Sequence, residues 1–445
     1  MKSKKAGSAL IQKYQNINQK FKAINFNKLA EKSDFKRRKE RKLSGKNLIL
    51  GFMIMALQGR NTFEQWAQEI GISIEKNISK QAVCKRITGC FVAFVLAVLN
   101  QVFSQHVKQT SKKIKTTGKL KSYQYIMVQD STIICLPQWL NKFYPGNYSR
   151  GEIKSLIRIQ LTIELRSNKI VYFQLTSYSK NDQSMSSTIF SVAKRGDLVI
   201  RDLGYFSLGV FEDMVERGVL FVSRIKPGVS IFDIKTGREI KLVEILRKEK
   251  KMDRWVLVGN KSKLPLRIVA TKLPDEIGNE KIRKEKHNRN KRLNHSQDYY
   301  ELMRYNIYLT TEKYSALNSQ DVARVYGLRW RIENIFKTWK SNLHLQSLIP
   351  GNIKMSKARA ESILYLMLIF ILQFQMKIYN EIISILKQRN KELEISLTKF
   401  SQFIVCRIQE IFEMNLSAIA DLVAYYCKYD SRKDRMNFIQ KLNLS

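Results

Sequence analysis

Cysteine is scarce in this chain and is absent from the patterns that a structural role requires. The 445 residues contain five cysteines, at positions 84, 90, 135, 406 and 427, and no two of them form a CxxC pair. None is accompanied by histidines at zinc-finger spacing. These absences argue against a disulfide framework and a cysteine-based zinc site, so we expect small apolar cysteines in a reducing compartment.

Signals for nucleotide hydrolysis, secretion and membrane insertion are also absent. No GxxxxGK[ST] motif occurs, and no signal-type apolar segment follows the lysine-rich residues 1–7. The most apolar stretch, residues 363–374, is interrupted by Gln373 and spans about a dozen residues, whereas a membrane helix needs roughly 20. We therefore expect a cytoplasmic protein with a buried helix here, no membrane contact and no nucleotide partner.

Positive charge, by contrast, is in large excess. The chain has 79 Lys and Arg against 38 Asp and Glu, a formal net charge of +41. This excess is spread along the whole chain, which favours a long series of phosphate contacts over a short localisation signal. The composition therefore predicts a polyanionic partner.

The length and the changes of pattern indicate several domains, with about three as the starting expectation. We expect an α/β fold in which a mixed sheet with a β-rich insertion is flanked by helical N- and C-terminal domains. The expected segments are an N-terminal helical domain (1–118), the first part of the core (119–226), the insertion (227–311), the second part of the core (312–380) and a C-terminal helical region (381–445).

The N-terminal segment contains a candidate helix-turn-helix. Its first helix would start at Thr62, its turn would contain Gly71, and Ser79 would cap a second helix that carries Lys80 and Arg86. A plain helical hairpin gives the same pattern. The sequence leaves these two interpretations open.

The core is predicted from short apolar runs with strand-like composition. A helix over residues 184–194 lies between two of these runs, and Ser207 would cap another helix. Residues 227–311 lack helical spacing, so we expect strands and basic loops there, with a last strand at 299–309. The expected core strands are residues 123–136, 155–165, 170–177, 198–201 and 219–226.

Two aspartates are placed on these strands. Asp130 follows Tyr125-Ile126-Met127-Val128 within the first strand, and Asp202 stands at the carboxyl end of Leu198-Val199-Ile200-Arg201. Strand ends of this kind border the binding crevice of an open α/β sheet. Each aspartate alone has a structural interpretation as a strand-end turn or helix cap, and their joint occurrence favours a site.

A third acidic residue lies on a long helix that we expect from Ser319 through Lys340. At about 100° per residue, Tyr326, Arg329, Glu333 and Lys340 share one stripe beside the apolar face. A glutamate among cations is commonly a solvated ion pair. Together with Asp130 and Asp202, however, it makes three carboxylates on rigid elements.

Three such carboxylates suit a two-metal site. They would hold two Mg²⁺ ions roughly 4 Å apart, with one ion activating the attacking oxygen and the other stabilising the leaving one. Arg329 and Lys340 would hold the phosphate backbone, Arg329 as a fork and Lys340 as a point charge.

The motifs resemble those of the DDE transposases of bacterial insertion sequences, in the insertion-sequence-four branch marked by Y-x₂-R-x₃-E-x₆-K. Tyr326, Arg329, Glu333 and Lys340 match this signature at every spacing. Asp130-Ser131-Thr132 resembles the first motif of the family, and Asp202-Leu203-Gly204-Tyr205 resembles the second. The resemblance covers roughly residues 120–380.

This resemblance implies an RNase H-like core, two Mg²⁺ or Mn²⁺ ions bound by Asp130, Asp202 and Glu333, and double-stranded DNA with inverted-repeat ends as substrate. It also implies stepwise cleavage and strand transfer. Two element ends must be brought together for coordinated cutting, so we expect a homodimer on DNA, and we expect the basic helical N-terminal domain to bind DNA. The family signature assigns the terminal phosphate to Tyr326, Arg329 and Lys340. Some members stack a flipped base on an insertion tryptophan, but we expect Trp255 to be a buried strand residue.

Two other functions compete with transposition. An RNase H-like nuclease or resolvase would need the three carboxylates but has no need of the phosphate-holding stripe. A DNA-binding regulator would need only the basic N-terminal helices and leaves Asp130, Asp202 and Glu333 unexplained.

Overall fold

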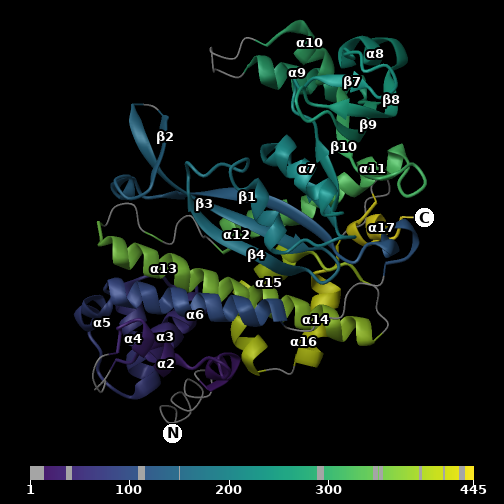
Figure 1. Cartoon of the computed structure of the whole chain (residues 1–445). Coiled ribbons are helices and arrows are strands. Elements are labelled where there is room, and N and C mark those ends of the chain that lie inside the picture. The colour runs from purple at the N-terminus through teal and green to yellow at the C-terminus, as the bar shows by residue number, and fades with distance from the viewer. Residues whose placement is uncertain are drawn as a thin grey trace.

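The computed structural model describes most of the chain and arranges it around one central sheet (Figure 1). N-terminal and C-terminal helices lie below this sheet in Figure 1, and the insertion lies above it at the right. The described residues are 15–36, 43–108, 116–149, 151–287, 295–343, 349, 354–389, 393–413, 416–429 and 436–444.

The N-terminal region is helical, as expected. Thr62 caps α4 with a reciprocal capping box, and the side chain of Ser79 accepts a hydrogen bond at the start of α5. Gly71 was expected in the turn but lies inside α4, where an added Cβ would come 2.8 Å from the Lys76 carbonyl oxygen. The chain turns instead at Glu75, which has a left-handed φ of 53°. The helices are α2 (Phe26–Lys32), α3 (Gly45–Leu57), α4 (Phe63–Ile74), α5 (Lys80–Arg86) and α6 (Gly89–Lys108).

The core strands form a mixed sheet in the order β4-β3-β1-β5-β6. Strands β1, β5 and β6 run parallel to one another, and β3 runs antiparallel to β1 and to β4. This topology confirms the expected α/β class and the RNase H-like arrangement. The bounds are β1 (Ile126–Leu136), β3 (Glu152–Glu164), β4 (Lys169–Ser177), β5 (Leu198–Arg201) and β6 (Leu220–Arg224), with the short β2 (Pro145–Ser149) pairing with β3.

The two faces of the sheet belong to two hydrophobic clusters. In β5, Leu198 and Ile200 pack into one cluster while Val199 between them packs into the other. This alternation is the period of two that a strand imposes on its side chains. One cluster continues into the N- and C-terminal helices, and the other includes α7 (Leu208–Glu216) and the insertion.

A long apolar helix below the sheet contains the stretch at residues 363–374. It runs through α13 (Lys357–Phe370), a π-helical segment (Ile371–Met376) and α14 (Lys377–Gln388), and α13 lies against α6. By length and composition alone, this helix and α6 are each sufficient to span a membrane. The most apolar window of the longer helix is 89% buried inside the protein, so the expected buried core helix is confirmed, although it is longer than the sequence indicated.

The insertion continues the central sheet, because β10 pairs with β6. It is less purely β than predicted. Helix α9 lies where we expected strands and basic loops, and α10 occupies the start of the predicted strand 299–309. Acidic residues in the first turn of α9 and basic residues in its last turn complement the helix dipole. The elements are β7 (Ile231–Asp233), α8 (Leu242–Glu249), β8 (Lys251–Val258), β9 (Leu264–Lys272), α9 (Asp275–Lys286), α10 (Gln297–Leu302) and β10 (Tyr305–Thr310).

Another expected helix is much shorter than predicted. Residues 184–194 form only a 3₁₀ helix, η3 (Ser186–Ser191). The Thr188 hydroxyl donates to the Met185 carbonyl, and the Ser191 hydroxyl donates to the Thr188 carbonyl. Such local bonds compete with helix formation, which accounts for the difference. The C-terminal region contains α15 (Leu397–Glu413), α16 (Leu416–Tyr426) and α17 (Phe438–Leu442).

Candidate active site

The parallel pairing of β1 with β5 brings the two aspartates together. The pairing of β1 with β5 ends at Gln129 and Arg201, so Asp130 and Asp202 each follow the last residue that these two strands pair. Asp130 is 8% exposed. Its Oδ1 accepts a hydrogen bond of 2.7 Å from the Ser131 amide. The sequence therefore placed both carboxylates at one edge of the sheet correctly.

The third carboxylate comes from a helix that is interrupted. The expected continuous helix is divided into α11 (Ser319–Tyr326), a 3₁₀ turn η5 (Gly327–Arg329) and α12 (Trp330–Ser341). Helix α12 packs against β1, and Glu333 lies in its first turn. The Glu333 carboxylate is ion-paired with Arg329, one turn earlier.

The Arg329 guanidinium lies between the three carboxylates. Its Nη1 donates to Asp130 Oδ2 at 2.8 Å, its Nε is 3.7 Å from Asp202 Oδ1, and its Nη2 pairs with Glu333. The Tyr326 hydroxyl donates to Asp202 Oδ1 at 3.1 Å. Asp130, Asp202, Glu333, Tyr326 and Arg329 are thus in one contact network.

Burial and charge have opposite effects on the ionisation of this network. Burial raises the pKa of Asp130 to about 7, and the positive charge of Arg329 only partly offsets it. Burial also raises the pKa of the Tyr326 hydroxyl, with a further contribution from Asp202. Burial lowers the pKa of Arg329, but Asp202, Tyr326, Asp130 and Glu333 outweigh it, so the net pKa is raised. Arg329 therefore remains a cation.

The raised pKa of Asp130 predicts a pH-dependent stability for the metal-free protein. Between the ordinary pKa of 3.8 and about 7, the folded state keeps a proton that the unfolded state has released. Stability from this group is therefore present at low pH and decreases as pH rises to about 7. Thermal unfolding should show this decrease in the wild type and lose it in Asp130→Asn. Parallel pH profiles for the two proteins would contradict the assignment.

Lys340 is not brought to the carboxylates. It lies near the end of α12, half-buried, and burial lowers the pKa of its amine while nearby Cys135 raises it. Cys135 is near the far end of β1. The structure therefore brings Tyr326, Arg329 and Glu333 to the two aspartates, whereas Lys340 lies about two turns beyond Glu333 on α12.

The donor set fits a divalent cation. Among the described residues, no three His, Cys, Asp or Glu side chains are grouped closely enough to hold a metal ion as they stand. The cationic Arg329 instead contacts all three carboxylates. Carboxylate oxygens on two strands and a helix are the ligand type that Mg²⁺ and Mn²⁺ prefer.

Arg224, which the sequence analysis did not single out, adjoins this network. Its guanidinium and that of Arg329 lie 5.5 Å and 5.6 Å from the centroid of the Tyr326 ring. Arg224 Nη2 donates to Asn306 Oδ1 at 3.3 Å, and the Lys281 amine donates to the same oxygen at 3.5 Å. The sequence signal that could have identified Arg224 was its position at the end of β6, a strand that runs parallel to the neighbouring β5.

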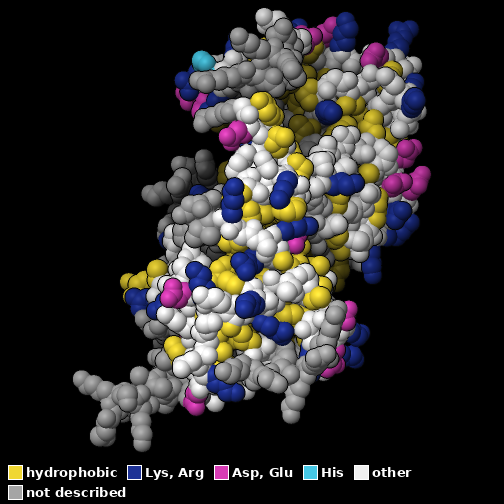
Figure 2. Space-filling model, turned by 90° about the vertical axis from the view of Figure 1, so that its left-hand side faces the viewer, with side chains coloured by type: hydrophobic (Ala, Val, Ile, Leu, Met, Phe, Trp, Pro, Cys, Tyr) yellow, Lys and Arg dark blue, Asp and Glu magenta, His cyan; other side chains and the backbone are white. Residues whose placement is uncertain are grey.

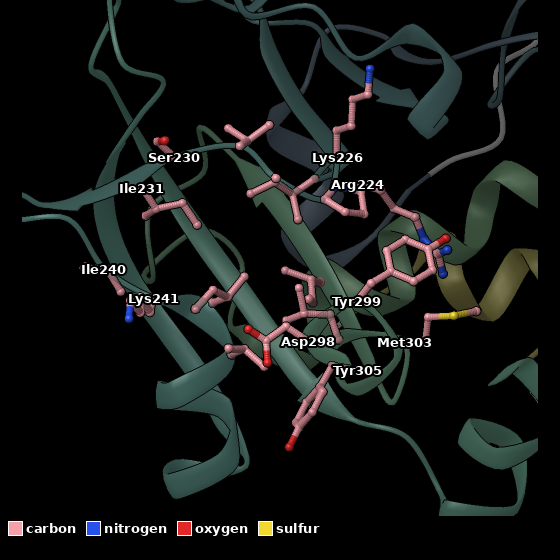
Figure 3. Close-up of a pocket in the computed structure, with 18 of the residues that line it drawn as sticks. Arg224, Lys226, Ser230, Ile231, Ile240, Lys241, Asp298, Tyr299, Met303 and Tyr305 are labelled. Atoms are coloured by element: carbon pink, nitrogen blue, oxygen red, sulfur yellow. The ribbon is translucent and has the colours of Figure 1, made fainter. Parts of the chain in front are cut away.

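Arg224 and residues of the insertion together line a cavity of about 530 Å³ (Figure 3). Apolar side chains such as Ile231 and Ile240 line it, and Lys226 and Lys241 also contribute to its wall. Trp255, which the sequence analysis discussed, does not line this cavity. It lies on β8 and is half-buried, so it is more exposed than expected.

The surface carries the charge excess. Figure 2 shows Lys and Arg side chains spread over the middle of the face that lies at the left in Figure 1, with few acidic side chains among them. This distribution agrees with the expectation of a polyanionic partner along a broad surface.

Comparison with known proteins gives consistent matches. Residues 111–349, more than half of the chain, match the family described as "Transposase DDE domain". The transposase for insertion sequence element IS231D of Bacillus thuringiensis subsp. finitimus is 28% identical over 335 residues, covering 71% of this chain and 69% of that protein. The transposase for insertion sequence element IS1151 of Clostridium perfringens is 25% identical, covering 93% of this chain and 86% of that protein.

Among solved structures, a piggyBac transposase synaptic complex with hairpin DNA gives a TM-score of 0.42 at 9% identity, covering 91% of this chain and 82% of that chain. The family match spans all three carboxylates, which come from β1, the end of β5 and α12. These findings confirm the resemblance noted in the sequence: this chain belongs to the DDE transposase family, whose members include the transposases of bacterial insertion sequences.

Proposed function

We propose that this transposase cleaves and rejoins DNA at the inverted-repeat ends of an insertion sequence, using Asp130, Asp202 and Glu333 as its catalytic residues. One observation carries the assignment: carboxylates from two strands and a helix all contact the guanidinium of Arg329. Residues more than a hundred positions apart converge in this way when a fold builds a site for a cation or a charged substrate.

Asp130, Asp202 and Glu333 would hold two Mg²⁺ or Mn²⁺ ions. When bound, such ions polarise the phosphoryl oxygens and lower the pKa of a bound water. Asp130 must release its proton to take part, because only the carboxylate is a ligand. In the metal-free protein, Arg329 would offset part of the negative charge of these carboxylates.

Tyr326, Arg329 and Lys340 are proposed to bind the DNA phosphates. Arg329 is suited to this because its planar guanidinium presents several donors to a phosphate. Lys340, farther along α12, would contact the backbone beyond the cleavage point. A nuclease or resolvase without strand transfer would not require these contacts.

The remaining assignments follow from this reaction. Two element ends have to be brought together, so we propose a homodimer on double-stranded DNA, in the cytoplasm and without membrane or nucleotide partners. We also propose that residues 1–118 bind DNA and that the core is formed by residues 119–226 and 312–380, with an insertion at 227–311 and a C-terminal helical region at 381–445. Exposed Lys80 and Gln81 on α5 support the first of these segments.

The function is tested by cleavage of a labelled linear duplex that carries the terminal repeat of the element, with Mg²⁺ or EDTA. We expect Mg²⁺-dependent nicking or hairpin formation at the repeat boundary, and joining of the released end to a second duplex. The control is a duplex of the same length with a scrambled repeat.

Two other outcomes of this experiment would each favour one of the alternative functions, the nuclease or the DNA-binding regulator. Cleavage that is indifferent to the repeat and joins no ends would favour the nuclease. Tight binding of the repeat without any metal-dependent cleavage would favour the DNA-binding regulator.

A further inference from the structure

A fourth carboxylate, that of Asp182, lies beside the two strands that carry Asp130 and Asp202. Asp182, in the loop between β4 and η3, accepts a hydrogen bond of 2.5 Å from the Ser131 hydroxyl at its Oδ1. The same oxygen accepts from Arg158 Nη1 at 3.0 Å and from Gln160 Nε2 at 3.3 Å. Its side chain is only 20% exposed. Asp182 is therefore held by both β1 and β3.

Asp182 also touches the segment after Asp202. A Cβ added to Gly204 would lie 2.8 Å from Asp182 Oδ2 and 3.2 Å from its Cβ. Contacts this short require one side to move, so the carboxylate fits here because position 204 is glycine. Gly204 belongs to the second sequence motif, whose glycine had no structural explanation from the sequence.

The chain that follows Asp182 joins the same two strands. Gln129, next to Asp130, donates from Nε2 to the Thr188 hydroxyl at 3.0 Å. The buried Arg201, next to Asp202, donates from Nη2 to the Ser186 carbonyl at 2.7 Å. The Ser186 hydroxyl in turn donates to the Tyr205 carbonyl at 2.8 Å. Residues 182–188 thus contact the chain neighbours of both catalytic aspartates.

Asp182 contacts β1 through Ser131, on the face opposite to the one that carries Asp130. Successive side chains of a strand point to opposite faces, so Ser131 points away from the face that carries Asp130. Gln160 is the direct cross-strand partner of Ser131, and Arg158 lies two residues along β3 on that same face. Asp182 therefore acts on the site through its neighbours.

We propose that Asp182 is a positioning residue that fixes the separation of Asp130 and Asp202, by holding Ser131 on one strand and packing over Gly204 beyond the other. The inference rests on the proposed function, because it assumes that Asp130 and Asp202 bind the metal ions. Partners that orient metal ligands in this way commonly contribute about 10-fold to 100-fold to metal affinity or activity.

The test compares Asp182→Ala, Asp182→Asn and wild type in the full chain. Calorimetry with Mn²⁺ alone measures metal affinity, and cleavage of the repeat duplex gives kcat and KM. We expect Asp182→Ala to weaken Mn²⁺ binding and lower kcat, each by about 10-fold to 100-fold, with little change in the KM for DNA. Asp182→Asn should recover most of the loss, because its amide oxygen still accepts from Ser131 and Arg158.

Gly204→Ala supplies a second test, in which the Asp182 side chain itself is left unchanged. It should lower kcat and Mn²⁺ affinity in the wild type, since its methyl group would displace Asp182. Combined with Asp182→Asn, Gly204→Ala should still lower kcat and Mn²⁺ affinity, because the clash persists. Combined with Asp182→Ala, it should cause little further loss of either, as expected for coupled positions. The control is Asp275→Asn, which removes an exposed carboxylate that pairs with Lys272 at 2.7 Å on the insertion.

Three results would overturn the proposal. Mn²⁺ affinity and kcat of Asp182→Ala equal to those of wild type would show that no positioning occurs. Loss of one bound Mn²⁺ in both Asp182 variants would show that Asp182 is itself a metal ligand and not a positioning residue. If Gly204→Ala lowered kcat and Mn²⁺ affinity equally in the wild type and in Asp182→Ala, its effect would not come from a clash with the Asp182 side chain. Retained Mn²⁺ binding in Asp130→Ala would instead reject the proposed function itself.

Discussion

Replacing Glu333 by glutamine should lower Mg²⁺-dependent cleavage of the terminal repeat by about 10³-fold, since several kcal/mol of metal-derived stabilisation correspond to this factor at 1.36 kcal/mol per tenfold. Glutamine keeps the shape of the side chain but removes the charge that a divalent cation requires. Binding of the repeat should change little, because the DNA contacts are assigned to other residues. Single-turnover cleavage and a gel-shift titration measure the two effects separately.

Glu280→Gln is the matched control for this substitution. Glu280 lies on α9 in the insertion and forms an exposed ion pair with Lys284, so its replacement should leave cleavage unchanged. Cleavage by Glu333→Gln at nearly the wild-type rate would remove Glu333 from the catalytic set, even if the other carboxylates proved essential.

Replacing Arg329 by alanine should destabilise the metal-free protein and abolish cleavage. The substitution removes the cation that all three carboxylates contact. Removing one partner of a buried pair costs about 3–5 kcal/mol, and partial exposure of Asp202 and Glu333 reduces this to roughly 2–3 kcal/mol. Mg²⁺ should raise the unfolding temperature of Arg329→Ala more than that of wild type, because the ion no longer competes with the guanidinium. Thermal unfolding with and without Mg²⁺ measures this difference.

Arg324→Ala tests whether the effect is specific. Arg324 lies on the preceding helix α11 and pairs with Asp321 at 3.6 Å while 41% exposed, so its loss should have little effect in either condition. An Arg329→Ala protein that unfolds like wild type, and is stabilised by Mg²⁺ no more than wild type, would show that Arg329 does not neutralise the carboxylates.

The sequence predicted the elements that carry Asp130 and Asp202 because short apolar runs leave few alternatives to buried strands. Motif spacing then connected Glu333, Tyr326 and Arg329 to them. These positions depend mainly on local pattern and on parallel pairing of neighbouring strands, which are both visible in the chain.

Other features depended on contacts that no local pattern encodes. Lys340 lies seven residues beyond Glu333 on α12, which is about two helical turns, so it lies near Cys135 and not with the carboxylates. Asp182 lies in a polar stretch that resembles an ordinary turn, and its partners Arg158 and Ser131 are 24 and 51 residues away. Helix α9 was missed because its residues are almost all polar, so it has little apolar periodicity.

The separation in sequence between the members of the site bears on how the protein is synthesised. Asp130 and its partner Arg329 are 199 residues apart, and β6 acquires its neighbour β10 only after the whole insertion has been made. Contacts of such high sequence separation form late in folding. A nascent chain that carries both aspartates therefore still lacks Arg329 and Glu333, so the network of three carboxylates around one guanidinium can form only after the whole insertion has been synthesised.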